Sequence, residues 1–166
     1  MSNPIAQRYH RYIILGVATA IVVLMDQLTK WQARANLALG QSVPDEGIFR
    51  FTLVSNDGGA FGLPIPQTLL VAFYFIAIGG IIGYLWRGAN APMINTVVLG
   101  ALLGGITGNL IDRIRFEYVV DFLDVRVWGD YHWPVFNLAD VAIVVATILI
   151  GYIVLKKYYQ QPSEQN

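Results

Sequence analysis

The chain has 166 residues, of which 55% are hydrophobic and 13% are charged, with eleven basic and eleven acidic side chains. Soluble domains carry roughly 25% charged residues, so this composition indicates an integral membrane protein of ordinary single-domain length. A nucleic-acid partner is excluded because there is no surplus of Lys and Arg to neutralise phosphates. The chain has no cysteine, which excludes disulfides, thiolate metal sites and a cysteine nucleophile.

Four apolar stretches predict membrane-spanning helices. The hydrocarbon core is about 30 Å thick and needs about 20 helical residues. The first uncharged stretch, residues 12–25, is too short, so its helix has to continue through Asp26. The last stretch, residues 141–155, is also too short unless its helix includes Asp140. The predicted spans are residues 13–31, 67–86, 92–111 and 136–155.

The parts outside the spans complete one membrane-embedded domain. We expect a single domain over residues 1–166, with outer segments at residues 32–66 and 112–135 and a disordered tail at residues 160–166. Residues 48–54 are rich in β-branched and aromatic types and are followed by Asn56-Asp57-Gly58-Gly59, which predicts a short strand or hairpin over the outer membrane face. Residues 117–128 are compatible with either a helix or a strand.

Orientation follows from the even number of spans, which puts both termini on one side. Basic residues divide five to six between the two sides, but the five on the terminal side lie close to helix ends, which favours cytoplasmic termini. Every acidic residue except Glu164 then lies at an outer helix end or in an outer segment. A cleaved signal peptide is the rival for the first stretch, but Asp26 and Lys30 interrupt it before the small-residue site at 33–35.

Glycines are spaced for close packing in two predicted spans. Gly100, Gly104 and Gly108 are four residues apart in the third span, as are Gly79 and Gly83 in the second. Small residues at this spacing let another helix approach closely, so we expect both sets to lie in helix–helix contacts.

Polar residues gather at the predicted outer helix ends. Asp26 and Lys30 are four residues apart in the order that favours an ion pair on a helix face, which is a structural role. Asn109, Asp112 and Arg113 share one face at the outer end of the third span. Ionisable groups at membrane depth are a functional-site hypothesis by default. The alternative is a structural network in which Arg113 pairs with Asp112.

More carboxylates follow in the connection to the fourth span. Asp121 and Asp124 precede Asp140 closely in the chain, and Asn137 stands three residues before Asp140. Two carboxylates held close together share a proton, so such a pair can act as base and acid at once. It can activate a water for attack on an amide carbonyl and protonate the departing nitrogen.

Other catalytic chemistries have weaker support. A metal site is not expected, because His10 and His132 are isolated and form no ligand-spaced pair. A Ser55–Lys30 dyad would need a proximity that the sequence does not show. No cofactor is expected.

Five motifs in this chain form a specific series that covers most of its length. They are DQLTK (26–30), NDGGAFG (56–62), GGITGNLIDR (104–113), VVDF (119–122) and FNLAD (136–140). In order, spacing and chain length the series resembles the bacterial lipoprotein signal peptidase family (signal peptidase II). The resemblance implies an all-α integral membrane fold, a four-helix transmembrane bundle with a small extracytoplasmic β-cradle and a mobile loop around the site. Asp57 is the clearest departure, since the family more often has a small polar residue such as Thr there.

The resemblance implies an intramembrane aspartyl endopeptidase of the bacterial inner (cytoplasmic) membrane. It would remove signal peptides from prolipoproteins that carry diacylglycerol on the lipobox cysteine, cutting just before that cysteine. Membrane lipids are the expected surroundings, and globomycin-type cyclic peptides are the expected inhibitors. The residues carried over are the catalytic pair Asp121 and Asp140, the substrate-binding residues Asn56, Gly58, Asn109, Arg113 and Asn137, and the supporting residues Asp26, Lys30 and Asp112.

Two other classes of function are compatible with carboxylates in membrane helices. A small proton-coupled transporter predicts acids near the bilayer midplane and repeats of opposite orientation, whereas these acids lie at one rim. A non-catalytic membrane assembly subunit built on the glycine faces would tolerate Asp121→Asn and Asp140→Asn, whereas a peptidase would not.

Overall fold

The computed structural model describes residues 4–58, 63, 65–86 and 93–160. Three features predicted from the sequence therefore lie partly outside the described residues. They are the loop at residues 59–62 of the NDGGAFG motif, the start of the third span at residue 92, and residues 161–166 of the predicted tail, whose first residue, Gln160, is helical rather than disordered.

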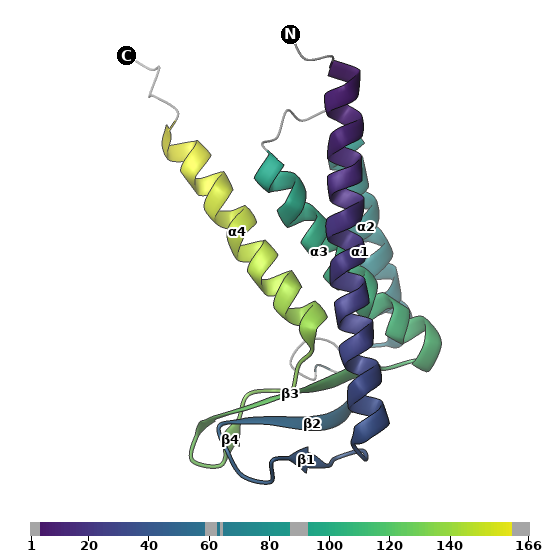
Figure 1. Ribbon diagram of the computed structural model, residues 1–166, viewed down its shortest axis with the longest axis vertical. Coiled ribbons are helices and arrows are strands. Elements are labelled where there is room, and N and C mark those ends of the chain that lie inside the picture. The colour runs from purple at the N-terminus through teal and green to yellow at the C-terminus, as the bar shows by residue number, and fades with distance from the viewer. Residues whose placement is uncertain (1–3, 59–62, 64, 87–92, 161–166) are drawn as a thin grey trace.

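Four helices form a bundle, with α3 contacting each of the other three (Figure 1). The helices are α1 (Pro4–Asn36), α2 (Gln67–Trp86), α3 (Met93–Phe116) and α4 (Leu138–Gln160). Within the described part of the chain, three helical segments are long and apolar enough to cross a membrane: Tyr9–Asn36, Met93–Phe116 and Leu138–Gln160. The apolar segment in α2, Gln67–Gly83, is shorter. The protein is therefore helix-rich, with three candidate membrane spans.

The helices α1 and α3 extend beyond the spans predicted for them. α1 ends at Asn36 and α3 ends at Phe116, each five residues past the predicted limit. The last turns carry Arg34 in α1 and Arg113 in α3, and cations there complement the negative end of the helix dipole. The extra turns place the polar ends of both helices next to the sheet.

Glycines on α3 allow α1 to approach closely. A Cβ built on Gly100 would lie 2.7 Å from Ala18 Cβ, and one on Gly104 would lie 2.7 Å from Val22 Cβ. These distances are far below van der Waals contact, so α1 and α3 pack backbone to backbone at this seam. The packing role expected for the α3 glycines is confirmed. The same expectation is wrong for Gly79 and Gly83, because no described atom lies within 4 Å of a Cβ placed on either of them.

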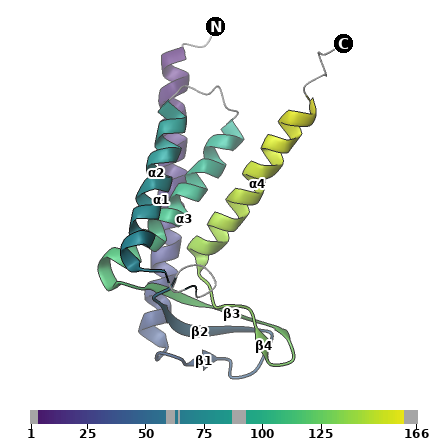
Figure 2. The same cartoon turned by 180° about the vertical axis from the view of Figure 1, so that it is seen from behind.

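A small antiparallel sheet lies across one end of the bundle (Figures 1 and 2). Its strands are β1 (Ser42–Val43), β2 (Phe49–Asn56), β3 (Val119–Trp128) and β4 (Tyr131–His132), in the spatial order β1-β2-β3-β4. The strand predicted at residues 48–54 is present as β2, and the ambiguous segment at residues 117–128 is the strand β3. The main partner of β2 is the distant β3, in a register that pairs Val54 with Asp121.

The sheet is anchored to the end of α1 by a small apolar core. Ala33 from α1 packs with Leu53 of β2 and with Val120 and Phe122 of β3. All four side chains are buried. Burial of this apolar surface fixes the sheet relative to the helix ends, and therefore fixes where the polar residues of β3 point.

Candidate active site

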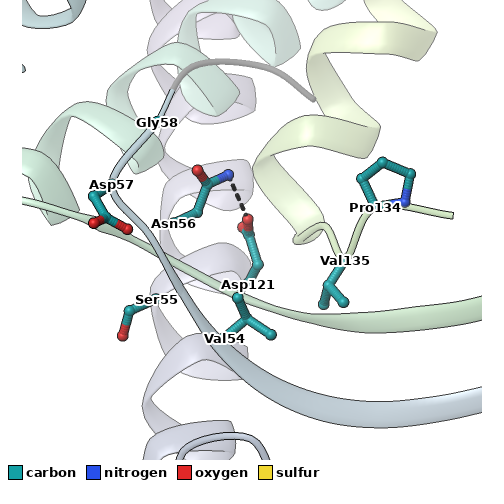
Figure 3. A pocket seen from close by; sticks show the side chains of 8 residues that line it. All are labelled: Val54, Ser55, Asn56, Asp57, Gly58, Asp121, Pro134 and Val135. Atoms are coloured by element: carbon teal, nitrogen blue, oxygen red, sulfur yellow. Dashed lines mark hydrogen bonds between the residues drawn. The ribbon is translucent and has the colours of Figure 1, made fainter. Parts of the chain in front are cut away.

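Asp121 is a buried carboxyl on β3 at the edge of a pocket. Its side chain is 1% exposed. Asn56 Nδ2, at the end of β2, donates to Asp121 Oδ2 at 2.8 Å (Figure 3). The pocket has a volume of about 520 Å³. It is lined by Val54, Ser55, Asn56, Asp57, Gly58, Asp121, Pro134 and Val135. One predicted catalytic acid therefore has access to a space that a ligand can enter.

Asp140 lies in the first turn of α4 and is part of that helix's cap. Asn137 is the N-cap residue, and its Oδ1 accepts a hydrogen bond from the backbone N–H of Asp140 at 2.9 Å. In return, Asp140 Oδ2 accepts from the backbone N–H of Asn137 at 3.2 Å. This reciprocal arrangement is a capping box, with Asp in the place that Glu or Gln usually takes. The cap explains why α4 begins at Leu138, two residues later than predicted.

Asn137 brings the two acids to one place. Besides its bonds with Asp140, its Nδ2 donates to Asp121 Oδ1 at 2.6 Å. Its side chain is fully buried, so these bonds are shielded from competing water. The structure thus joins Asp121 and Asp140, which lie on a strand and a helix, through a single asparagine.

Asn109 on α3 supports the same cluster from the other side. Its Nδ2 donates to Asp140 Oδ1 at 2.8 Å, and its Oδ1 accepts from Asn137 Nδ2 at 3.1 Å. The same oxygen accepts from Lys30 Nζ at 2.9 Å. Because the lysine orients the amide oxygen, the amide nitrogen is directed at Asp140.

Lys30 forms a buried ion cluster with two carboxylates. Its Nζ lies 2.8 Å from Asp26 Oδ2 and 2.9 Å from Asp112 Oδ2, and all three side chains are at most 3% exposed. The predicted Asp26–Lys30 pair is present. The alternative in which Arg113 pairs with Asp112 is wrong, because Asp112 is bound by the lysine of a different helix.

The carboxylates of this ion cluster also hold backbone groups near the acids. Asp26 Oδ1 accepts from the backbone N–H of Ala139 at 3.0 Å, and Asp112 Oδ2 accepts from that of Val120 at 3.1 Å. Val120 and Ala139 immediately precede Asp121 and Asp140 in the chain. Gln27 joins the cluster by donating to Asp112 Oδ1 at 2.9 Å. Gln27 is not among the site residues predicted from the sequence, although its place in the DQLTK motif is a signal for it.

Arg113 lies apart from this network and holds the start of α2. Its Nη1 donates to Gln67 Oε1 at 2.8 Å, and its Nη2 donates to the carbonyl oxygen of Gly58. It is 3% exposed, and its Nε has no hydrogen-bond partner among the described residues. Arg113 and Gly58 are therefore joined to each other at the pocket rim. Gln67 was not predicted as a site residue and carried no motif signal.

Asp124 points away from the site. It stands three residues after Asp121 on the same strand, so the two side chains face opposite sides of the sheet. Asp124 Oδ2 lies 2.6 Å from Arg50 Nη2 and 2.7 Å from Thr52 Oγ1, and Asp124 Oδ1 lies 2.7 Å from His132 Nδ1. Burial acts to raise the pKa of Asp124, but these three partners outweigh it and hold the pKa below its usual value. This cluster fixes the sheet.

The electrostatics of Asp121 differ from those of an ordinary surface carboxyl. Burial, together with the smaller effect of the negative charge of Asp140, raises the pKa of Asp121 from 3.8 to about 7. Hydrogen bonds from Asn56 and Asn137 oppose the shift only in part. A carboxyl of this kind holds a proton near neutral pH and can exchange it with a reacting group. In the described part of the chain, no three His, Cys, Asp or Glu side chains are grouped to hold a metal ion.

Comparison with known proteins agrees with this arrangement. The family described as signal peptidase (SPase) II matches residues 18–156. The lipoprotein signal peptidase of Nitratidesulfovibrio vulgaris (strain DP4) is 38% identical over 160 residues, covering 92% of this chain and 93% of that protein. The lipoprotein signal peptidase of Moorella thermoacetica is 40% identical over 147 residues, covering 87% and 94%.

Solved structures are similar over the same range. One described as a bacterial membrane enzyme superposes with a TM-score of 0.80 at 26% identity, covering 90% of this chain and 92% of the other. A second has a TM-score of 0.75 at 28% identity, with coverage of 84% and 91%. The family match over most of the chain, together with relatives of this similarity, shows that the chain belongs to the signal peptidase II family of aspartic peptidases.

Proposed function

We propose that this protein removes signal peptides from diacylglyceryl-modified prolipoproteins, with Asp121 and Asp140 as its catalytic pair. Its family and the names of its relatives support the substrate class. The observation that carries the proposal is the bridge through Asn137, which contacts both carboxyls within 3.2 Å. Cleavage falls just before the lipidated cysteine.

The reaction needs only these two carboxyls and a water. One carboxyl is protonated and the other is ionised, because two such groups held together do not both ionise easily. The ionised group takes a proton from water as its oxygen attacks the scissile carbonyl carbon. The protonated group then gives its proton to the amide nitrogen as the C–N bond breaks. The products are a carboxyl end on the signal peptide and a free amine on the cysteine.

Side chains around the pair are suited to hold the substrate backbone. A helical peptide satisfies its own amides, so local unwinding at the scissile bond frees groups that need new partners in the membrane. Asn56 lines the pocket and offers its amide there, whereas the buried Asn109 and Asn137 hold the two acids in place. Arg113 and Gly58 form the rim where the extended peptide passes. We infer that globomycin-type cyclic peptides compete for this space.

We further propose that α2 is a fourth membrane span, with both termini cytoplasmic and the sheet forming an extracytoplasmic cradle. The 20 residues of α2 cover about 30 Å at about 1.5 Å per residue, which matches the hydrocarbon core. The start of α1 and the end of α4 lie at the end of the bundle away from the sheet (Figure 1). The active site then faces the outer interface, where the scissile bond of a membrane-inserted signal peptide lies.

The transporter and assembly-subunit alternatives have less support. A transporter places its acids near the bilayer midplane, whereas Asp112, Asp121 and Asp140 gather at the end of the helices where the sheet lies. Membership of a peptidase family favours hydrolysis over both alternatives.

A gel-shift assay on a diacylglyceryl-modified precursor tests the reaction. The purified protein is expected to shorten the modified precursor and to leave an unmodified precursor of the same sequence intact. An intact modified precursor contradicts the proposed reaction. Equal cleavage of both precursors contradicts the proposed substrate class.

Cysteine labelling tests the orientation, because the chain has no cysteine of its own. Asp130→Cys, in the turn between β3 and β4, is expected to react with a membrane-impermeant maleimide added to intact spheroplasts. Gln160→Cys, at the end of α4, is expected to react only after the membrane is opened. The reverse pattern contradicts the proposed orientation.

A further inference from the structure

The pocket beside Asp121 is acidic. Its lining contains two carboxylates, from Asp57 and Asp121, and no basic side chain. Asp57 is exposed, and among the described residues its carboxylate takes part in no hydrogen bond or ion pair. The lining of the pocket therefore carries negative charge, and the nearby Arg113 donates to the carbonyl oxygen of Gly58 instead of pairing with Asp57.

Asp57 is also close to the proposed reacting centre along the chain. It follows Asn56, whose side chain donates to Asp121 at 2.8 Å. Consecutive Cα atoms are about 3.8 Å apart, so Asp57 lies about one extended residue from the asparagine that holds the acid. In Figure 3, Asp57 lies across β2 from Asp121, with its carboxylate pointing away from that acid, and both residues line the pocket.

We propose that Asp57 is a specificity-determining residue that favours a basic side chain in the mature part of the substrate, just after the cleaved bond. This inference rests on the proposed function. The signal segment stays in the membrane, whereas the mature chain leaves toward water and passes the exposed rim that carries Asp57. The second and third residues after the cleaved bond are the ones within reach, since an extended chain advances about 3.3 Å per residue.

The expected preference is moderate because Asp57 is in contact with water. Two unit charges about 7 Å apart in a water-like dielectric change an association constant by about threefold. A substrate with Lys is therefore favoured about threefold over one with Gln, and Gln is favoured by a similar factor over Glu. Salt reduces the preference, because the screening length is about 10 Å at 0.1 M ionic strength and shorter above it.

The test uses three diacylglyceryl-modified precursor peptides that differ only in having Lys, Gln or Glu at the second residue after the cleaved bond. Cleavage is measured as kcat/KM in uncharged detergent micelles at low ionic strength. The wild type is expected to prefer Lys over Gln over Glu. Asp57→Asn is expected to remove most of this order, and Asp57→Lys to reverse it. Reversal requires a direct charge interaction, which a general disturbance of the loop does not produce.

Asp130→Asn is the matched control, because it removes the same charge from an exposed turn that does not line the pocket. It is expected to keep the wild-type order. Equal kcat/KM for all three peptides with the wild type, or an unchanged order with Asp57→Lys, overturns the inference while leaving the proposed reaction intact. Failure of the wild type to cleave any of the peptides overturns the proposed function and this inference with it.

Discussion

Asn137 and Asp140 exchange two hydrogen bonds across the first turn of α4, each using its backbone N–H and a side-chain oxygen. The catalytic role proposed for Asp140 and the start of the helix thus depend on the same contacts. Asn137 has a third role, because its Nδ2 also donates a hydrogen bond to Asp121 Oδ1 at 2.6 Å. Mutation can separate the capping of α4 from the bridge to Asp121.

Asn137→Ala is expected to lower both stability and activity. Loss of an N-cap costs about 1 kcal/mol, and buried partners left without hydrogen bonds add about 1–3 kcal/mol. Displacement of the two carboxyls is expected to lower kcat/KM by roughly 100-fold. Thermal unfolding in detergent and cleavage of the lipidated precursor measure the two effects.

Asn137→Ser is the variant that separates them, because serine also caps helices but lacks the amide that reaches Asp121. It is expected to unfold closer to the wild-type temperature than Asn137→Ala and to remain poorly active. Full activity of Asn137→Ser would show that the bridge to Asp121 is dispensable.

Lys30→Met is expected to destabilise the protein strongly. The substitution leaves the buried carboxylates of Asp26 and Asp112 facing each other without their cation. Breaking a buried ion pair in this way costs about 3–5 kcal/mol. Lys156→Met, at an exposed position near the end of α4, is the control and is expected to leave the unfolding temperature nearly unchanged. Normal stability of Lys30→Met with complete loss of cleavage would contradict the structural role given to this lysine.

Gly104→Ala is expected to loosen the seam between α1 and α3. The added methyl would lie 2.7 Å from Val22 Cβ and 2.9 Å from the carbonyl oxygen of Thr19, so the helices have to move apart. Overpacking of this kind costs about 1–3 kcal/mol. Gly79→Ala meets no described atom within 4 Å and is expected to be neutral or slightly stabilising, because Ala favours helix over Gly. The comparison is made by thermal unfolding, and equal behaviour of the two variants contradicts the packing argument.

The pH dependence of cleavage is expected to show a loss on the alkaline side. Burial and the charge of Asp140 raise the pKa of Asp121 to about 7, so the proton that the pair needs is lost as the pH rises through that value. The apparent pKa belongs to the coupled pair. Measurement of kcat/KM from pH 5 to 9 tests this, and a rate that keeps rising above about pH 8 contradicts it.

The same shift has a consequence for stability. Because the folded-state pKa of Asp121 is raised, the folded state binds more protons than the unfolded state between pH 3.8 and about 7. The contribution of Asp121 to stability is therefore full below pH 3.8 and is lost as the pH rises toward 7. Asp121→Asn cannot ionise, so its unfolding temperature is expected to fall less across this range than that of the wild type.

Features set by local spacing were predictable from the sequence. The Asp26–Lys30 pair follows from positions four apart on a helix, and the contact between Asn137 and Asp140 follows from positions three apart. Composition likewise predicted the helical segments. Composition predicts the residues at which the polar ends of these helices stop less accurately. The helix caps and the sheet, rather than hydropathy, decide those positions.

Features that depend on distant pairing were not predictable from residue patterns. Whether Asp121 or Asp124 faces the pocket depends on the register between β2 and β3, which joins residues about seventy positions apart. The pairing of Asp112 with Lys30, instead of with its neighbour Arg113, depends on the packing of α1 against α3. The family motifs single out Asp121 and Asp140, whereas the residues alone leave Asp112 and Asp124 as equal candidates.

The central claim, that Asp121 and Asp140 act together on one peptide bond, is tested most directly by cleavage of the diacylglyceryl-modified precursor with single Asp→Asn variants. Asp121→Asn and Asp140→Asn are each expected to stay folded and to lose activity by at least about 100-fold, because an amide neither takes nor gives the proton. Asp124→Asn, on the opposite face of the same strand, is expected to keep its activity at temperatures where it is folded. Cleavage at the wild-type rate by either Asp121→Asn or Asp140→Asn would contradict the account.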